Sequence, residues 1–97
     1  MKIDFNLYVE NGGIVDIDQI LQKSCGLVVV GIVANGHISK GDKVNIQVDG
    51  KDPISDEIHR IELYGDEILS ANEDQKIGIL LKNVSKDQLV LYLKGAA

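Results

Sequence analysis

The stretch of residues 26–44 reads GLVVVGIVANGHISKGDKV. Its first eight residues are too apolar to leave a solvent-exposed face along their whole length, which predicts a buried strand. Asn35-Gly36 then predicts a hairpin, because a type I′ turn needs positive φ at both central residues. Lys40-Gly41-Asp42 predicts a second tight turn in which the Asp42 carboxylate bonds backbone donors. Residues 43–48 alternate cleanly between polar and apolar side chains, as half-buried strands do.

Short apolar runs between turn residues continue through the rest of the chain. Patterns of this kind predict further strands at residues 3–9, 56–64, 76–82 and 89–93. Residues 14–22 fit either a helical face or an extended strand, residues 68–74 an irregular connection, and residues 83–88 a polar link with room for one helical turn. Several short strands at this spacing indicate a sandwich or a small closed barrel, and closure would remove exposed strand edges.

Length and charge restrict the class of protein. A chain of 97 residues with 44% hydrophobic residues holds one domain with one aliphatic core. The formal net charge is −5, and Arg60 is the only arginine. Because phosphates are neutralised by Lys and Arg, this composition disfavours direct nucleic-acid binding by the chain alone. Lys40, Lys43 and Lys51 are close in sequence and leave a local basic face as an alternative, although scattered solvated lysines are the favoured interpretation.

Cysteine content and hydropathy indicate a cytoplasmic protein. Cys25 is the only cysteine, so no intramolecular disulfide can form, which is typical of a reducing compartment. We expect it to be a small side chain packed at the start of a strand. The first residues lack the features of a signal peptide, and no apolar run approaches the length of a membrane helix. We expect no membrane association.

The sequence contains no recognisable catalytic or cofactor-binding motif. Gly26 and Gly31 have the separation of a phosphate-binding loop, but the lysine and hydroxyl residues that must follow are missing. His37 and His59 are far apart and have no neighbouring Cys or His, which disfavours a zinc site. Adjacent carboxylates, such as Asp56 and Glu57, are interpreted as solvated turn residues rather than an acid–base pair. The sequence predicts no enzyme, no metal and no cofactor.

Residues 26–44 resemble the second, β-barrel domain of translational GTPases such as elongation factor Tu and initiation factor two. That family follows the pattern G-x-V-x-x-G-x-V-x-x-G-x-I-x-x-G-D-x-V. Nine positions match it here: Gly26, Val28, Gly31, Val33, Gly36, Ile38, Gly41, Asp42 and Val44. Residues 58–63 are similar to the family strand V-x-x-I-E-M, and residues 77–84 to V-G-L-L-L-R-G-I.

The resemblance implies an all-β fold, a small closed six- to seven-stranded β-barrel. Residues 1–97 are expected to form a single stand-alone translation-factor-like barrel without GTPase machinery. Gly31 is expected where the barrel bends or a neighbouring strand approaches closely, while Gly36 and Gly41 lie in turns. About seven extra residues, around Asn11-Gly12-Gly13, depart from the family pattern.

The resemblance also supplies candidate binding residues. In elongation factor Tu a glutamate of the I-E-M strand packs on the terminal adenosine of aminoacyl-tRNA, and an arginine follows three residues later. Glu62 matches the glutamate, whereas Gly65 stands in place of the arginine. The binding residues predicted are Arg60, Glu62 and Tyr64, together with His37, Lys40 and Lys43 of the turn at 37–43.

Two functions remain open at this point. The first is a translation-related module that docks on the ribosome, a tRNA or a translation factor. The second is a non-translational interaction or structural protein that reuses the barrel, favoured by the acidic charge and by Gly65. A nucleotide- or flavin-binding barrel is a distant third, because no phosphate-binding loop is present.

Overall fold

The computed structural model describes residues 2–48 and 50–94, which form nine strands and one helix. The strands are β1 (Lys2–Val9), β2 (Ile14–Lys23), β3 (Gly26–Asn35), β4 (His37–Ser39), β5 (Lys43–Gln47), β6 (Ile54–Leu63), β7 (Asp66–Ile68), β8 (Ser70–Asn72) and β9 (Lys76–Leu81), and the helix is α1 (Lys86–Leu93). The ambiguous segment 14–22 is therefore strand. The connection predicted at 68–74 contains the end of β7 and all of β8, which corrects that prediction.

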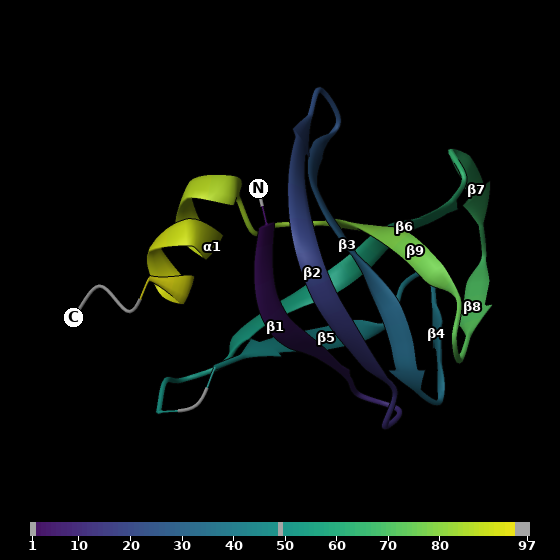
Figure 1. The fold of residues 1–97 in the computed structure, drawn as a ribbon, viewed down its shortest axis with the longest axis horizontal. Helices are drawn as coiled ribbons and strands as arrows, with labels where there is room; N and C mark the ends of the chain where they lie inside the picture. Colours follow the sequence, from purple (N-terminus) through teal and green to yellow (C-terminus); the bar gives the residue numbers. More distant parts are fainter. Residues whose placement is uncertain (1, 49, 95–97) are drawn as a thin grey trace.

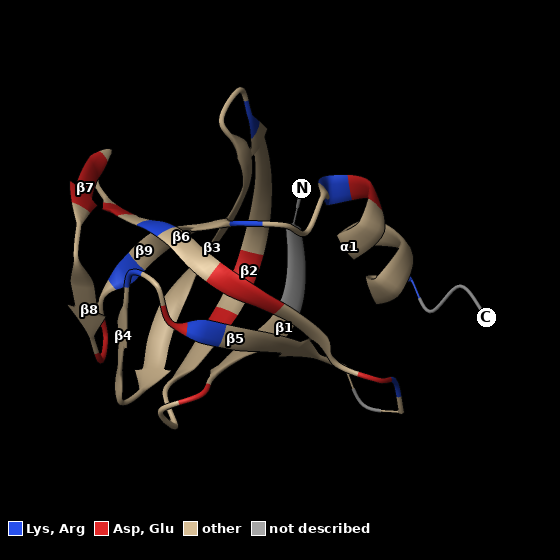
Figure 2. Ribbon diagram, turned by 180° about the vertical axis from the view of Figure 1, so that it is seen from behind, with Lys and Arg blue, Asp and Glu red and all other residues tan. Residues whose placement is uncertain are grey.

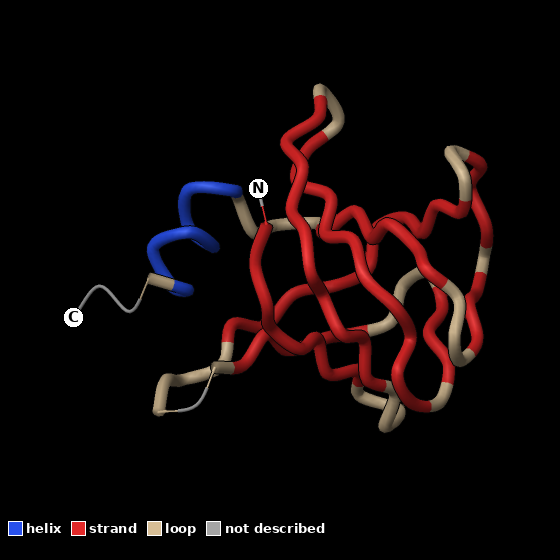
Figure 3. Tube along the Cα trace, in the orientation of Figure 1, coloured by secondary structure: helices blue, strands red, loops and turns tan. Residues whose placement is uncertain are grey.

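Six strands close into an antiparallel barrel in the order β5-β1-β2-β3-β9-β6, and the pairing of β5 with β6 completes the ring. In Figure 1 and Figure 3 the strands wrap around a common interior. β7 continues the sheet beyond β6, while β4 and β8 form a separate two-stranded ribbon. The predicted all-β closed barrel is confirmed, and the sandwich alternative is wrong.

Aliphatic side chains fill the barrel, and its two ends are covered by different elements. Helix α1 lies at one end and the β4–β8 ribbon at the other (Figure 1). Leu89 of α1, Ile38 of β4 and Ala71 of β8 are all fully buried and belong to the same core cluster as the barrel side chains. The core therefore extends from one cover to the other.

Gly31 lies where the backbone of β2 comes close to β3. A Cβ atom at this position would be 2.1 Å from the carbonyl oxygen of Asp16 and 2.8 Å from the Cα of Ile17. The β2–β3 register shifts between Ile17 and Gln19, immediately beside this contact. Only glycine leaves room for the neighbouring backbone, so the close approach predicted for Gly31 is confirmed.

The turns of the 26–44 segment form, but one of them is not a hairpin. Gly36 and Gly41 have φ angles of +68° and +91°, and the Asp42 carboxylate accepts a 2.8 Å hydrogen bond from the Ser39 amide. β4, however, pairs with β8 and not with β3, and Asn35 does not have positive φ. Both edges of β3 are already paired with β2 and β9, so no edge is free for a hairpin partner.

Residues 89–93, predicted as the last strand, lie instead in helix α1. Ser85 caps this helix by accepting a 3.1 Å hydrogen bond from the Gln88 amide. The barrel is already closed, so a further strand would find no edge within it. As a helix, the segment buries Leu89 in the core, which contributes about 2 kcal/mol.

Asp56, interpreted from the sequence as a solvated turn residue, is buried in β6 with 8% of its surface exposed. Its carboxylate accepts hydrogen bonds from the backbone amides of Glu57 (2.7 Å), Asn83 (3.0 and 3.1 Å) and Val84 (2.8 Å) and from the Asn83 side chain (3.1 Å). These bonds compensate the desolvated charge and fix the link to α1 against β6. The solvated interpretation of Asp56 is wrong.

We predict that Gly31→Ala destabilises the barrel by roughly 2–4 kcal/mol, because the added methyl group would overlap the β2 backbone. Urea unfolding followed by circular dichroism measures the change. Gly50→Ala is the matched control: its φ is +81° and its added Cβ meets no atom within 4 Å. This control should lose only about 1 kcal/mol, from backbone strain. Equal losses in both variants would contradict the close approach at Gly31.

Candidate functional site

The outer face of β2, β3, β9 and β6 presents two rows of side chains. The register places Leu21, Val28, Leu80 and Arg60 side by side across the four strands. The next row holds Gln19, Val30, Gly78 and Glu62. The residues between the rows, Val29, Ile79 and Ile61, are fully buried inside the barrel. Because side chains alternate along a strand, both rows point outward.

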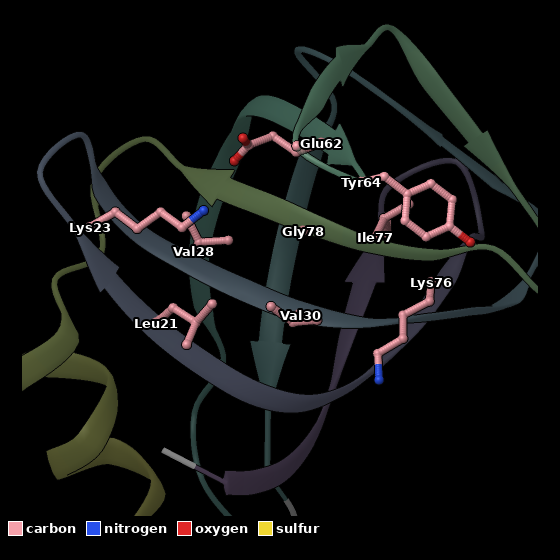
Figure 4. Close-up of a pocket in the computed structure, with 10 residues that line it drawn as sticks. Leu21, Lys23, Val28, Val30, Glu62, Tyr64, Lys76, Ile77 and Gly78 are labelled. Atoms are coloured by element: carbon pink, nitrogen blue, oxygen red, sulfur yellow. The ribbon is translucent and has the colours of Figure 1, made fainter.

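The second row has a gap at Gly78, and this gap is the base of a surface hollow of about 320 Å³. Figure 4 shows Gly78 at its centre, between Val28 and Val30 of β3 and the end of β6. Ten residues line the hollow: Leu21, Lys23, Val28, Val30, Glu62, Tyr64, Gly65, Lys76, Ile77 and Gly78. A Cβ atom at Gly78 would lie 3.2 Å from Cγ1 of Val28, so the Val28 side chain packs close to this position.

An apolar cluster lies beneath this outer face. Val28 and Leu80 point outward but are only 2% and 3% exposed, and they face each other across β3 and β9. Neither belongs to the core cluster that fills the barrel. Val28 and Leu80 therefore form a small buried apolar contact on the outer side of the sheet, beside the hollow.

Tyr64 stands at the rim of the hollow in a strained conformation. It occupies the two-residue turn between β6 and β7 with a φ of +53° and 96% of its surface exposed. A bulky residue in the left-handed region costs about 1 kcal/mol. With so little of its surface buried, its own packing provides little compensation. The positive φ of Tyr64 and Gly65 closes the two-residue hairpin between β6 and β7, and the exposed ring makes Tyr64 a candidate contact for a partner.

Charges of both signs surround the hollow. Lys76 forms an ion pair with Asp18 of β2, in which Nζ lies 3.8 Å from Oδ2. Glu62 and Lys23 form no ion pair with any residue that the structure describes. In Figure 4 the Lys23 ammonium group and the Glu62 carboxylate extend toward the same side of the hollow, and the Tyr64 ring points to the other side. Two uncompensated charges of opposite sign therefore face the same space.

The structure brings together only some of the predicted binding residues. Glu62 and Tyr64 both line the hollow, whereas Arg60 lies one row away on the same face of β6, opposite Leu80. The residues of the turn at 37–43 lie elsewhere. Lys43 lines a different depression with Glu10 and Asp56, and the Lys40 ammonium group is 3.3 Å from the carboxylate of Glu67 in β7. His37 is exposed, and its backbone carbonyl accepts a hydrogen bond from the Asn11 side chain. These three do not line the same pocket as Glu62.

The basic face considered for Lys40, Lys43 and Lys51 does not form as one surface. Lys51 bonds the carbonyl of Tyr92 in α1 and lies 5.2 Å from the centre of its ring. Lys40 is paired with β7, near the β4–β8 end of the barrel. Among the described residues, Figure 2 shows basic segments interspersed with acidic ones along β5, β6, β7 and β9. Lys40 and Lys51 thus make separate local contacts.

Sequence reasoning missed the residues that β2, β3 and β9 contribute: Leu21, Lys23, Val28, Val30, Lys76, Ile77 and Gly78. Gly78 offered one usable signal, since a glycine inside a strand often marks the close approach of another group. Its neighbours across the sheet depend on strand register, which the sequence does not specify.

Other chemistry is sparse in the described part of the chain. No group of three or more His, Cys, Asp and Glu residues there is arranged to hold a metal ion. Cys25 is exposed in the turn between β2 and β3, so the prediction that it packs at a strand start is wrong. Within residues 2–48 and 50–94, no helix has the length and apolar character needed to cross a membrane.

A comparison of the chain with protein-family models gives no match.

We predict that Tyr64→Asn stabilises the protein by about 0.5–1 kcal/mol, because asparagine tolerates positive φ and the exposed ring loses little packing. Thermal or urea unfolding measures the difference. Leu69→Asn, at a 73% exposed site without positive φ, is the control and should change stability by less than about 0.5 kcal/mol. A clear loss of stability in Tyr64→Asn would show that the ring packs on the barrel and is not held under strain.

Proposed function

We propose that this protein is a binding module related to the second domain of translational GTPases, with no GTPase activity of its own. It docks on the ribosome, a tRNA or a translation factor through the hollow at Gly78. The nine-position pattern of residues 26–44 supports this kinship, and a closed six-stranded barrel is compatible with it.

One observation carries the proposal. Glu62 matches the family glutamate that packs on a bound adenosine, and its side chain borders the hollow whose base is Gly78. Tyr64 lies at the same rim, exposed and at positive φ. A ready-made hollow, a free carboxylate and an exposed aromatic ring are features expected of a recognition site.

A second candidate function is a protein-interaction module outside translation. Gly65 stands where the family has an arginine, and the turn that contains it borders the hollow. The net charge of −5 also opposes close approach to phosphate groups. These two features favour a protein surface over an RNA end.

We predict that the purified protein co-sediments with ribosomes at low salt, and that the double variant Glu62→Ala/Tyr64→Ala lowers its affinity at least about tenfold. Loss of both rim contacts removes the charged and the aromatic recognition groups together. Quantitative pelleting with increasing ribosome concentration measures the change.

The control is Tyr8→Ala/Glu10→Ala, which removes the same residue types from β1 and the residue that follows it. In the ring of strands β1 lies opposite β9, so this control leaves the hollow intact. Pelleting that is absent for the native protein, or equally weakened in both double variants, would count against the proposal.

A further inference from the structure

Two Asn-Gly pairs lie close together where the loop after β1 contacts the end of β3. The side-chain amide of Asn35 donates a 3.3 Å hydrogen bond to the carbonyl of Gly12. In return, the side-chain amide of Asn11 donates a 3.2 Å hydrogen bond to the carbonyl of His37. A Cβ atom at Gly13 would lie 2.6 Å from that same His37 oxygen. The two segments are therefore in direct backbone contact, and an asparagine amide from each holds the other.

Asn-Gly pairs are chemically labile, because glycine has no Cβ to hinder attack by its own backbone nitrogen. This nitrogen forms a bond to the side-chain carbonyl carbon of the asparagine and closes a cyclic imide. The bond from that carbon to the side-chain nitrogen breaks, and the nitrogen leaves as ammonia with the proton of the glycine amide. Solvent water then opens the imide at either carbonyl, which gives aspartate or isoaspartate. A base that removes the amide proton accelerates the attack.

The two pairs differ in the group that their glycine amide contacts. The Gly36 amide donates a 3.1 Å hydrogen bond to Oε1 of Glu73. The Gly12 amide donates a 2.9 Å hydrogen bond to the backbone carbonyl of Val9. A carboxylate at this distance is within reach of the proton that it would remove as a general base, whereas a peptide carbonyl is too weakly basic to take it. Of the two pairs, Asn35-Gly36 is therefore the one equipped to react.

The fold, and not the local sequence, places Glu73 beside Gly36. Glu73 belongs to the turn between β8 and β9, and two backbone hydrogen bonds of 2.9 and 3.1 Å hold this turn against Val33 of β3. The Glu73 side chain and the Asn35-Gly36 pair are exposed, so solvent water reaches the reacting groups. Unfolding would separate the carboxylate from the amide, because 37 residues lie between their positions in the chain.

We propose that Asn35 is a site of spontaneous deamidation, in which the Glu73 carboxylate removes the Gly36 amide proton and the Gly36 nitrogen displaces ammonia from the side chain. The proton leaves with the ammonia, so the Glu73 carboxylate is regenerated. The product has a carboxylate where Asn35 had an amide donor, so it no longer donates to the Gly12 carbonyl and adds a negative charge near Glu73. The contact between the loop after β1 and the end of β3 then opens. This reaction is independent of binding at the hollow.

The test follows the whole folded chain during prolonged incubation at neutral pH, with peptide mapping by mass spectrometry at successive times. Asn11 in the same sample is the internal control. We expect Asn35 to convert faster than Asn11 in the folded chain, and the two rates to become similar in urea. Glu73→Gln should slow conversion at Asn35 at least about tenfold and leave Asn11 unchanged, because glutamine keeps the hydrogen-bond acceptor but removes the base. In the converted protein, nuclear magnetic resonance should show shifted amide signals for Gly12 and Gly13.

Several outcomes would overturn the inference. Conversion at Asn35 that is absent, or no faster than at Asn11, in the folded chain would refute the reactive site. A difference between the two asparagines that persists in urea, or an Asn35 rate unchanged in Glu73→Gln, would refute the role of the carboxylate. Unchanged amide signals in the converted protein would refute the opening of the contact. The comparison of folded with unfolded native chain needs no substitution, so it remains decisive should Glu73→Gln disturb the turn.

Discussion

The pairing of β5 with β6 is the contact on which the rest of the structure depends. It joins the two edges of a sheet that otherwise runs from β5 to β6, through Lys43–Glu57, Val44–Asp56, Asn45–Ser55 and Ile46–Ile54. Closure turns one face of every strand toward a common aliphatic interior. It also leaves the two ends of the barrel to be covered, which α1 and the β4–β8 ribbon accomplish with Leu89, Ile38 and Ala71.

The candidate site is a consequence of the same closure. A closed ring fixes the register of β3, β9 and β6, and that register sets Gly78 between Val30 and Glu62 on the outer face. Rigid strands therefore position the base of the hollow, while the strained turn at Tyr64 supplies its exposed rim. A scaffold of paired strands with an exposed aromatic residue at its edge is consistent with the binding role proposed above.

The sequence predicted those features that depend on local chemistry. The strand at 26–33, the positive φ of Gly36 and Gly41, the Asp42 cap and the close approach at Gly31 all follow from residue types and short spacings. Other features depend on which strand edges remain free once the barrel has closed. These are the helix at 86–93, the buried role of Asp56 and the β4–β8 pairing. In the site, family spacing indicated Glu62, and Tyr64 was predicted beside it. Lys23 and Gly78 join them only through strand register.

Closure itself can be measured directly by nuclear Overhauser contacts between the backbone protons of β5 and β6. The account predicts cross-strand contacts for all four pairs from Lys43–Glu57 to Ile46–Ile54, together with those between β1 and β5 and between β6 and β9. Contacts of the last two kinds without any between β5 and β6 would describe an open sheet. That result would contradict the closed barrel.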